Sequence, residues 1–292
     1  MGTVTDILWL SFTATADEDG WRVGSALRRR GASRGFLRRL KRHGLLTVNA
    51  SPVHLDHVLK AGDVVTVTGQ ETSTITGQEM ALEVVYEDEY LLVIDKPPGV
   101  LVHPARTETE GTLANAVAAR FTQQGIPATP RPLNRLDRGT SGLVLFARSP
   151  LAGHMFCRLR ARAQVTREYI AIVEGIPPQR EFTVDLPVEG KKALTRCRLC
   201  RRWREASALR IQPLSGRLHQ IRFHLSAVGH PLAGDTRYGA RLALPISRPA
   251  LHAWRLVFPH PITGKELCLQ APVPLDFRTL IRFLNRTIPR TG

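Results

Sequence analysis

The chain has 292 residues, 43% of them hydrophobic, which is enough apolar material for a buried core and not a composition typical of disorder. Lysine and arginine number 41 against 25 acidic residues, giving a formal net charge of +16. This excess predicts a polyanionic partner, either a nucleic acid or an anionic membrane surface. No uncharged apolar run approaches the roughly 18 residues that span a bilayer.

The compartment can be predicted from the start of the chain and from its cysteines. The first twenty residues hold no basic residue and only a short apolar stretch, which is not the pattern of a secretory signal. Four cysteines are too few for a disulfide framework in a chain of this length. We therefore expect a cytoplasmic protein that does not insert into a membrane.

The N-terminal part is strongly basic. Residues 21–43 hold nine lysines and arginines and no acid, with apolar residues at spacings of three and four, which predicts two short amphipathic helices. The break falls at residues 31–33, and Ser33 is the expected N-cap of the second helix. The runs LLTVNA and VVTVTG, with turn signals between them, then predict strands. Four side chains of the second helix are candidate phosphate contacts: Arg34, Arg38, Arg39 and Lys41.

The stretch SRGFLRRLKRHGLLTVNASPVHLDHVLKAGDVVTV resembles the S4-like RNA-binding domain, over residues 17–69, after an N-terminal segment of residues 1–16. The resemblance implies a small α/β module that docks on structured RNA through phosphates and shape. The alternative is an ordinary solvated face, but such faces normally mix both signs of charge. Residues 70–79 are polar and threonine-rich and are the expected linker.

Residues 80–292 are expected to form one large domain. Strand-like runs (LLVIDK, GLVLFA, EYIAIV, ALRIQPL) alternate there with helix-like runs (TLANAVAARFTQQ, AGHMFCRLRARAQ). The pattern predicts an α+β fold with a central sheet, but does not say whether neighbouring strands are parallel or antiparallel. The stretch DFRTLIRFLNR predicts a last helix.

A single carboxylate stands out in this domain. Residues 111–167 hold nine arginines and one acid, Asp137, in the run PLNRLDRGTSGLVLFA. Asp137 precedes a glycine turn and an apolar strand, so it is placed at a loop–strand junction, where a rigid support can present a side chain to a cleft. One interpretation is a surface ion pair with a neighbouring arginine, which contributes about 0–1 kcal/mol. The other is a nucleophile kept ionised by arginine.

The surrounding motifs favour the second interpretation. NRLDRGTSG, preceded by IDKPPGVLVHP and followed by REYIAIVEG, SGRLHQIRFHLSAVGHPLAGDTRYG and LHAWRLVFPHP, is similar to the RluA-like family of RNA pseudouridine synthases. The matches keep the family's order over residues 82–274, and an S4-like domain often precedes this fold. The resemblance implies a mixed, largely antiparallel central sheet flanked by helices.

The resemblance also implies roles for individual residues. Asp137 corresponds to the catalytic aspartate, and Arg222 to the arginine that pairs with it. Tyr169 corresponds to the tyrosine that packs on the target base and assists removal of its C5 proton. Arg135 corresponds to the arginine that enters the RNA stack in place of the extruded nucleotide, which offsets the cost of unstacking. The remaining expected contacts to RNA or base are Asn134, where the family most often has histidine, Thr140, His219 and Gln220.

One acid suffices for the implied reaction, which breaks the uridine N1–C1′ bond, rotates the uracil and rejoins it through C5. Hydrolysis of an O-glycosidic bond generally needs two carboxylates, so a nucleoside or glycoside hydrolase is a weaker alternative. A non-catalytic RNA-binding or ribosome-assembly factor is the other. We expect a monomer that acts on structured ribosomal or transfer RNA without a metal or organic cofactor.

Other motifs carry less weight. Cys197 and Cys200 have zinc-knuckle spacing but lack a second pair, and on a strand they face opposite sides. The histidines at 219, 224 and 230 lack the four-residue offset of a zinc helix. His103 is expected to be a structural residue near the cleft, and the pair at 234–235 part of a structural turn.

Overall fold

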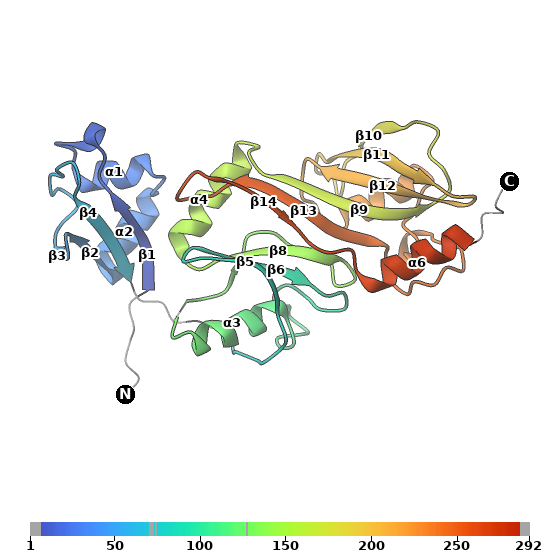
Figure 1. The fold of residues 1–292 in the computed structure, drawn as a ribbon, viewed down its shortest axis with the longest axis horizontal. Coiled ribbons are helices and arrows are strands. Elements are labelled where there is room, and N and C mark those ends of the chain that lie inside the picture. The colour runs from blue at the N-terminus through green and yellow to red at the C-terminus, as the bar shows by residue number, and fades with distance from the viewer. Residues whose placement is uncertain (1–6, 70–72, 74, 127, 287–292) are drawn as a thin grey trace.

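The molecule contains two β-sheets, a small one in the N-terminal unit and a large one in the rest of the chain (Figure 1). The computed structural model describes residues 7–69, 73, 75–126 and 128–286. Residues 1–6 of the expected N-terminal segment, and residues 70–72 and 74 of the expected linker, lie outside the described residues. In the part that is described, no helix has both the length and the apolar character needed to cross a membrane.

The small unit places two helices on a four-stranded antiparallel sheet with the order β1-β4-β2-β3. As predicted, Ser33 caps the second helix, its hydroxyl accepting a hydrogen bond from Phe36 N at 3.0 Å. Phe36, Leu37 and Leu40 are buried while the basic side chains of the same helix point to solvent. The elements are β1 Ile7–Thr13, η1 Ala16–Glu18, α1 Val23–Arg29, α2 Arg34–His43, β2 Gly44–Val48, β3 Ser51–Pro52 and β4 Val64–Gly69.

The start of the small unit differs from the expectation. We expected residues 1–16 to form a separate segment, but β1 pairs with β4 from Ile7↔Gly69 to Thr13↔Val64. Trp9 on β1 is fully buried, with its ring 5.6 Å from that of Phe36. The unit therefore begins at or before residue 7, because burial of this tryptophan against α2 requires β1 in the sheet.

The large sheet has ten strands in the order β10-β11-β12-β9-β13-β8-β6-β5, with β14 paired to β13 and β7 to β8. All pairs are antiparallel except β8 with β13. The expected mixed, largely antiparallel sheet is confirmed. The strands are β5 Glu83–Glu87, β6 Leu91–Lys96, β7 Arg131–Pro132, β8 Ser141–Ala147, β9 Thr166–Glu174, β10 Glu181–Asp185, β11 Leu194–Arg202, β12 Ala206–Pro213, β13 Leu251–Pro259 and β14 Glu266–Gln270.

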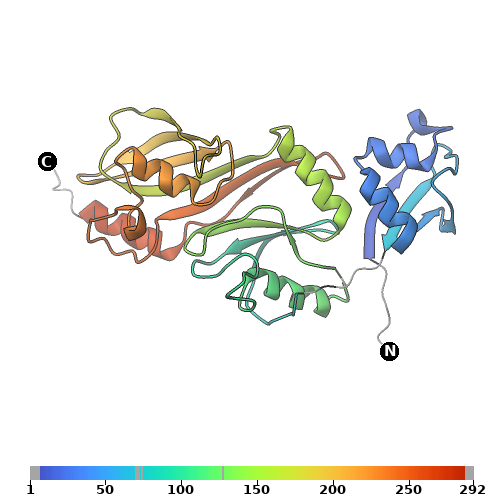
Figure 2. The ribbon, with the colours of Figure 1, turned by 180° about the vertical axis from the view of Figure 1, so that it is seen from behind.

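Helices cover the large sheet (Figures 1 and 2). Helix α6 packs Phe277, Leu280 and Leu284 into a cluster with Ile172 and Ala206 of the sheet. Helix α4 lies between the small unit and the large sheet in both views. The helices are α3 Leu113–Gln123, α4 Pro150–Ala161, α5 Gln220–Ala227 and α6 Leu275–Arg286, with the 3-10 turn η2 Thr236–Tyr238.

Polar contacts join the two units. The Ser149 hydroxyl, at the N-cap of α4, donates to the carbonyl of Trp9 at 3.2 Å. Residues 75–79 lie against α3. The side-chain amide of Asn115 donates to the carbonyl of Thr76, and the backbone carbonyl of Asn115 accepts from Gln78 N. The described part of the expected linker is thus bound to the large domain.

Candidate active site

Asp137 lies in the loop between β7 and β8, as expected for a loop–strand junction. The loop turns tightly there, because the Asp137 carbonyl accepts from Thr140 N at 3.0 Å. Asn134 fixes the loop to β8: its amide donates to the carbonyl of Leu143 at 3.0 Å and accepts from Leu145 N at 2.8 Å. The amide of Asn134 is thus engaged with the backbone of β8 and supports the loop.

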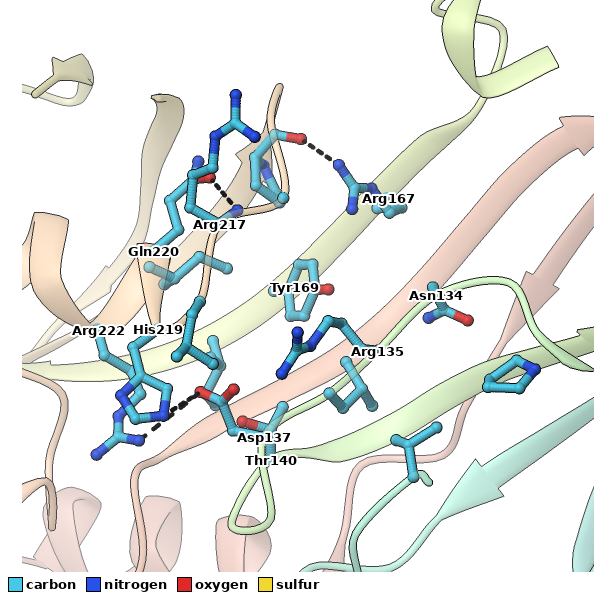
Figure 3. Close-up of a pocket in the computed structure, with 18 of the residues that line it drawn as sticks. Asn134, Arg135, Asp137, Thr140, Arg167, Tyr169, Arg217, His219, Gln220 and Arg222 are labelled. Atoms are coloured by element: carbon cyan, nitrogen blue, oxygen red, sulfur yellow. Dashed lines mark hydrogen bonds and ion pairs between the residues drawn. The ribbon is translucent and has the colours of Figure 1, made fainter. Parts of the chain in front are cut away.

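Helix α5 supplies the opposite wall of the site. His219 begins the helix with a left-handed φ of 52°, which turns its ring toward the loop. Arg222 Nη1 lies 3.7 Å from Asp137 Oδ2, and His219 Nε2 lies 3.9 Å from the same oxygen (Figure 3). The expected pairing of Arg222 with Asp137 is therefore present in the structure, across 85 residues of sequence.

The ion-pair partners of Asp137 are not its sequence neighbours but Arg222 and His219. Arg138 forms an ion pair with Glu108, and the Arg135 side chain lies between the Tyr169 ring and Asp137 (Figure 3). The alternative that Asp137 is a surface carboxylate paired with a sequence neighbour does not describe this geometry. The carboxylate belongs to a cluster assembled from distant segments.

A second carboxylate, Asp235, holds Arg222 in place. Arg222 donates from Nε and Nη2 to the two oxygens of Asp235, both at 2.7 Å, and its guanidinium lies 4.8 Å from the centre of the Tyr238 ring. Burial opposes the charge of Arg222, but the bonds to Asp235 outweigh it and raise the pKa of the guanidinium. Because two of its nitrogens are engaged by Asp235, Arg222 attracts Asp137 without covering its oxygens.

Sequence reasoning assigned Asp235 only to a structural turn. It is 1% exposed and lies in the loop that leads to η2. A glycine–aspartate pair ahead of a short turn carries no signal for a partner thirteen residues earlier on a helix. The contact between Asp235 and Arg222 forms only when this loop packs against α5.

Tyr169 closes the cluster from β9. The residue is 7% exposed, and its ring faces the same space as Arg135 and Asp137 (Figure 3). Burial raises the pKa of its phenol, and the negative charge of Asp137 adds to that shift against the opposing effect of Arg167. The side chain is therefore a neutral ring with an intact hydroxyl proton.

The cluster lines a cavity of about 580 Å³, a size typical of small-molecule and nucleotide sites. Arginines from α4, β9 and the turn before α5 make its rim basic, namely Arg160, Arg167 and Arg217. The Gln220 side chain accepts from Arg217 N and the Ser215 hydroxyl and donates to Leu194 O and Thr195 Oγ1. Its amide therefore holds the turn before α5 at the edge of the cavity.

The structure brings eight predicted site residues to this cavity and keeps four apart from it. The cavity is lined by Asn134, Arg135, Asp137, Thr140, Tyr169, His219, Gln220 and Arg222. Thr140 is buried, so little of it is open to a ligand. The four basic residues of the small unit, Arg34, Arg38, Arg39 and Lys41, are exposed on α2.

The two cysteines face opposite sides of a strand, as expected, and two of the histidines bond to separate backbone carbonyls. On β11, Cys197 is buried and Cys200 is exposed, and burial raises the pKa of the Cys197 thiol to about 12. His224 bonds to the carbonyl of Leu186, while His230 bonds to that of Glu174. Within the described ranges, no group of three or more histidine, cysteine or acidic side chains could hold a metal ion.

Comparison with known proteins gives consistent matches. A family profile described as RNA pseudouridylate synthase matches residues 90–227. An RNA pseudouridine synthase of Bacillus subtilis, YlyB, itself described as uncharacterized, is 35% identical over 273 residues, 87% of this chain and 90% of the relative. The ribosomal large subunit pseudouridine synthase D of Vibrio cholerae is 34% identical over 275 residues, 84% of each chain.

The fold is also found among solved structures. The human protein RNA pseudouridylate synthase domain containing 4 superimposes with a TM-score of 0.60 at 23% identity. The alignment covers 70% of this chain and 93% of the human one.

Proposed function

Because the chain belongs to the RluA-like family of RNA pseudouridine synthases, and is thus an isomerase that converts uridine in RNA to pseudouridine, we propose that Asp137 is its catalytic carboxylate. The observation that carries the proposal is the cluster of Asp137, Arg222 and Tyr169 in one cavity. At about 4 Å and an effective dielectric near 20, an ion pair contributes roughly 4 kcal/mol before desolvation is subtracted. Arg222 therefore places a positive charge beside the Asp137 carboxylate.

The reaction is an isomerisation, so its bonds balance within the substrate. The N1–C1′ bond breaks, a C5–C1′ bond forms, C5 loses a proton and N1 gains one. Attack on C1′, attack on the base and removal of a ribose proton are three possible first steps, and each requires an ionised carboxylate beside the target nucleotide. Asp137 supplies the carboxylate from the loop between β7 and β8.

The other side chains of the cavity place the base. The neutral ring of Tyr169 provides an apolar face on which a uracil can stack. Because its hydroxyl keeps its proton, Tyr169 assists removal of the C5 proton only by passing its own proton on as it accepts that one. Arg135 is exposed at the cavity and fills the gap that an extruded uridine leaves in the RNA stack. A cationic plane at that position offsets the few kcal/mol that base flipping costs.

The substrate is structured ribosomal or transfer RNA, bound in part by the small unit acting as an S4-like domain. The basic helix α2 supports this assignment, because its positive side chains are exposed and its apolar ones buried. The relative from Vibrio cholerae is named for the large ribosomal subunit. A single chain supplies every residue of the cluster, which supports a monomer, and the four free cysteines support a cytoplasmic location.

Substitution of the carboxylate tests the proposal. Asp137→Asn keeps the shape of the side chain and removes its charge, so pseudouridine formation should fall to about a thousandth of wild type or less, while RNA affinity stays within about twofold. The substrate is RNA from cells that lack the protein, and pseudouridine is mapped by mass spectrometry after incubation.

Asp185→Asn is the matched control, because Asp185 is exposed on β10 and does not line the cavity. This variant should isomerise the same uridines at the wild-type rate. Activity of Asp137→Asn within tenfold of wild type would contradict the assignment of Asp137.

A further inference from the structure

Two buried basic side chains hold the backbone of the loop that carries Asp137. They are Lys96 and Arg248, and neither lines the cavity. They donate hydrogen bonds to the consecutive carbonyls of Arg138 and Gly139. The resemblance to the family assigned no role to either residue.

Arg248 makes the larger set of contacts. It is 9% exposed and donates from Nη1 to the Gly139 carbonyl at 2.9 Å and to the Leu251 carbonyl at 3.2 Å. Its Nη2 reaches the Ser141 hydroxyl at 3.2 Å. One guanidinium therefore joins the end of the Asp137 loop to the start of β13.

Asp276 anchors this guanidinium from the other side. Arg248 Nε donates to Asp276 Oδ2 at 2.6 Å and Nη2 to Oδ1 at 3.0 Å, while the guanidinium lies 5.2 Å from the centre of the Phe277 ring. Asp276 is in the first turn of α6, where a negative charge also suits the helix dipole. The loop is thus tied to the C-terminal helix.

Lys96 holds the carbonyl of Arg138, the residue before Gly139. It is fully buried at the end of β6, and its ammonium donates to the carbonyls of Pro97 and Val100 at 2.8 Å and of Arg138 at 3.2 Å. Gly99 N also donates to the Arg138 carbonyl at 2.8 Å. The backbone beside Asp137 is therefore held from two directions.

We propose that Arg248, anchored by Asp276, is a positioning residue for the isomerisation: it holds Gly139 and Ser141 so that the Asp137 carboxylate stays at its working distance from Arg222. This inference rests on the proposed role of Asp137. Arg222 is itself held by Asp235, so each half of the catalytic ion pair has its own buried anchor. The 3.7 Å separation of the pair is then set by two rigid supports.

The physical need for such support follows from the position of Asp137. The loop lies at the mouth of a cavity, and the carboxylate must stay ordered when the RNA enters and when the base turns. Displacement of a reacting group by about 1 Å can cost about 10²-fold in rate. A planar guanidinium with several donors fixes two neighbouring backbone positions at once, which a lysine ammonium at the same place would do less well.

The test is single-turnover isomerisation at saturating RNA, together with RNA affinity and the unfolding midpoint of each variant. We expect Arg248→Met to lower the single-turnover rate constant about 100-fold and Arg248→Lys about tenfold, with RNA affinity within about twofold of wild type. The partial recovery with lysine distinguishes loss of positioning from loss of bulk. Reactions are run well below the unfolding midpoint of every variant.

Arg255→Lys is the matched control. Arg255 is also an arginine of the β13 region paired with an acid, Glu168, but it does not contact the Asp137 loop. Its rate constant should stay at the wild-type value. Asp276→Asn weakens the anchor and keeps the contact of Arg248 to Gly139. Its single-turnover rate constant should fall less than that of Arg248→Met, and it replaces Arg248→Met in the test if the methionine variant does not fold.

Three results would overturn the proposal. The first is a folded Arg248 variant with a rate constant within twofold of wild type. The second is a loss that appears only as weaker RNA binding, and the third is an equal loss in Arg255→Lys. Failure of the proposed function gives a different result, because Asp137→Asn would then remain active whatever the Arg248 variants do.

Discussion

The central contact of the site is a guanidinium that serves two carboxylates. Arg222 makes short bonds with Asp235 and a longer approach to Asp137. A buried bidentate pair of this kind is costly to break, because removal of one partner leaves an uncompensated charge, at about 3–5 kcal/mol. The longer approach leaves the Asp137 oxygens accessible to a substrate.

We therefore expect Asp235→Asn to damage both stability and activity. It should lower the free energy of unfolding by about 3 kcal/mol and the isomerisation rate at least tenfold, because the freed guanidinium is drawn onto Asp137. Urea unfolding and single-turnover rates measure the two effects. The control is again Asp185→Asn, and a variant with wild-type stability and rate would show that Arg222 does not depend on Asp235.

A buried histidine, His252, contacts the first residue of β8, just after the Asp137 loop. His252 Nδ1 is 2.9 Å from the Ser141 hydroxyl, and burial lowers the pKa of its imidazole from 6.5 to about 4. The folded state therefore binds the proton more weakly than the unfolded state. Between pH 6.5 and 4 the unfolded chain binds more protons at this position, so the contribution of His252 to stability falls as the pH falls.

This shift makes a prediction for acid stability. Wild type should lose free energy of unfolding between pH 7 and pH 4 because the pKa of His252 is about 4 in the folded state and 6.5 in the unfolded state. His252→Gln removes this difference of about 2.5 pKa units and should therefore reduce the loss by roughly 3 kcal/mol. Urea unfolding of both proteins at several pH values measures the difference. Parallel curves for wild type and variant would contradict the buried neutral histidine.

At the scale of elements, the helices predicted from the sequence pattern correspond to α1, α2, α3, α4 and α6. Ser33, the expected N-cap of the second helix, caps α2 in the structure. The predicted strands at residues 64–69 and 91–96 are also present, and the run predicted at residues 208–214 falls on β12, which spans residues 206–213. Strand β1 was missed because its short run gave no sign of which sheet it would join.

Helix α2 carries the prediction for RNA binding. Its basic side chains are exposed on one face, and each phosphate that they neutralise should contribute about −0.7 to −0.9 to the slope of log affinity against log salt concentration. Replacing Arg34, Arg38, Arg39 and Lys41 with glutamine should therefore weaken RNA binding and reduce the magnitude of that slope by about 3. Binding is measured at several salt concentrations.

The matched control removes the same number of charges from β11. Arg196, Arg198, Arg201 and Arg202 are exposed there, and β11 lies at the end of the large sheet far from the small unit (Figure 1). The corresponding glutamine variant should leave the slope nearly unchanged. If both variants reduce the slope equally, the α2 residues act only through the net charge of the protein.

At the scale of the whole molecule, the large sheet assembles the site. Asp137 precedes β8, Tyr169 lies on β9 and Arg222 on α5, and β8 and β9 are both neighbours of β13. The parallel pairing of β8 with β13 depends on a close approach, since a side chain at Gly142 would meet the Ala253 backbone at 2.2 Å. That approach brings the Arg248 region, just before β13, under the Asp137 loop.

The sequence by itself determined the α+β class and the basic character of α2, and it predicted the two-part organisation and, through motifs that resemble the family, the roles of Asp137, Tyr169 and Arg222. These follow from local periodicity, capping residues, charge and motifs, all of which are properties of neighbouring residues in the chain. Only the tertiary structure decided the strand order, the place of β1, the engagement of Asn134 and Gln220 by the backbone, and the anchors Asp235 and Arg248. Those depend on contacts between residues far apart in sequence, which form only when the sheet closes and buries their charges.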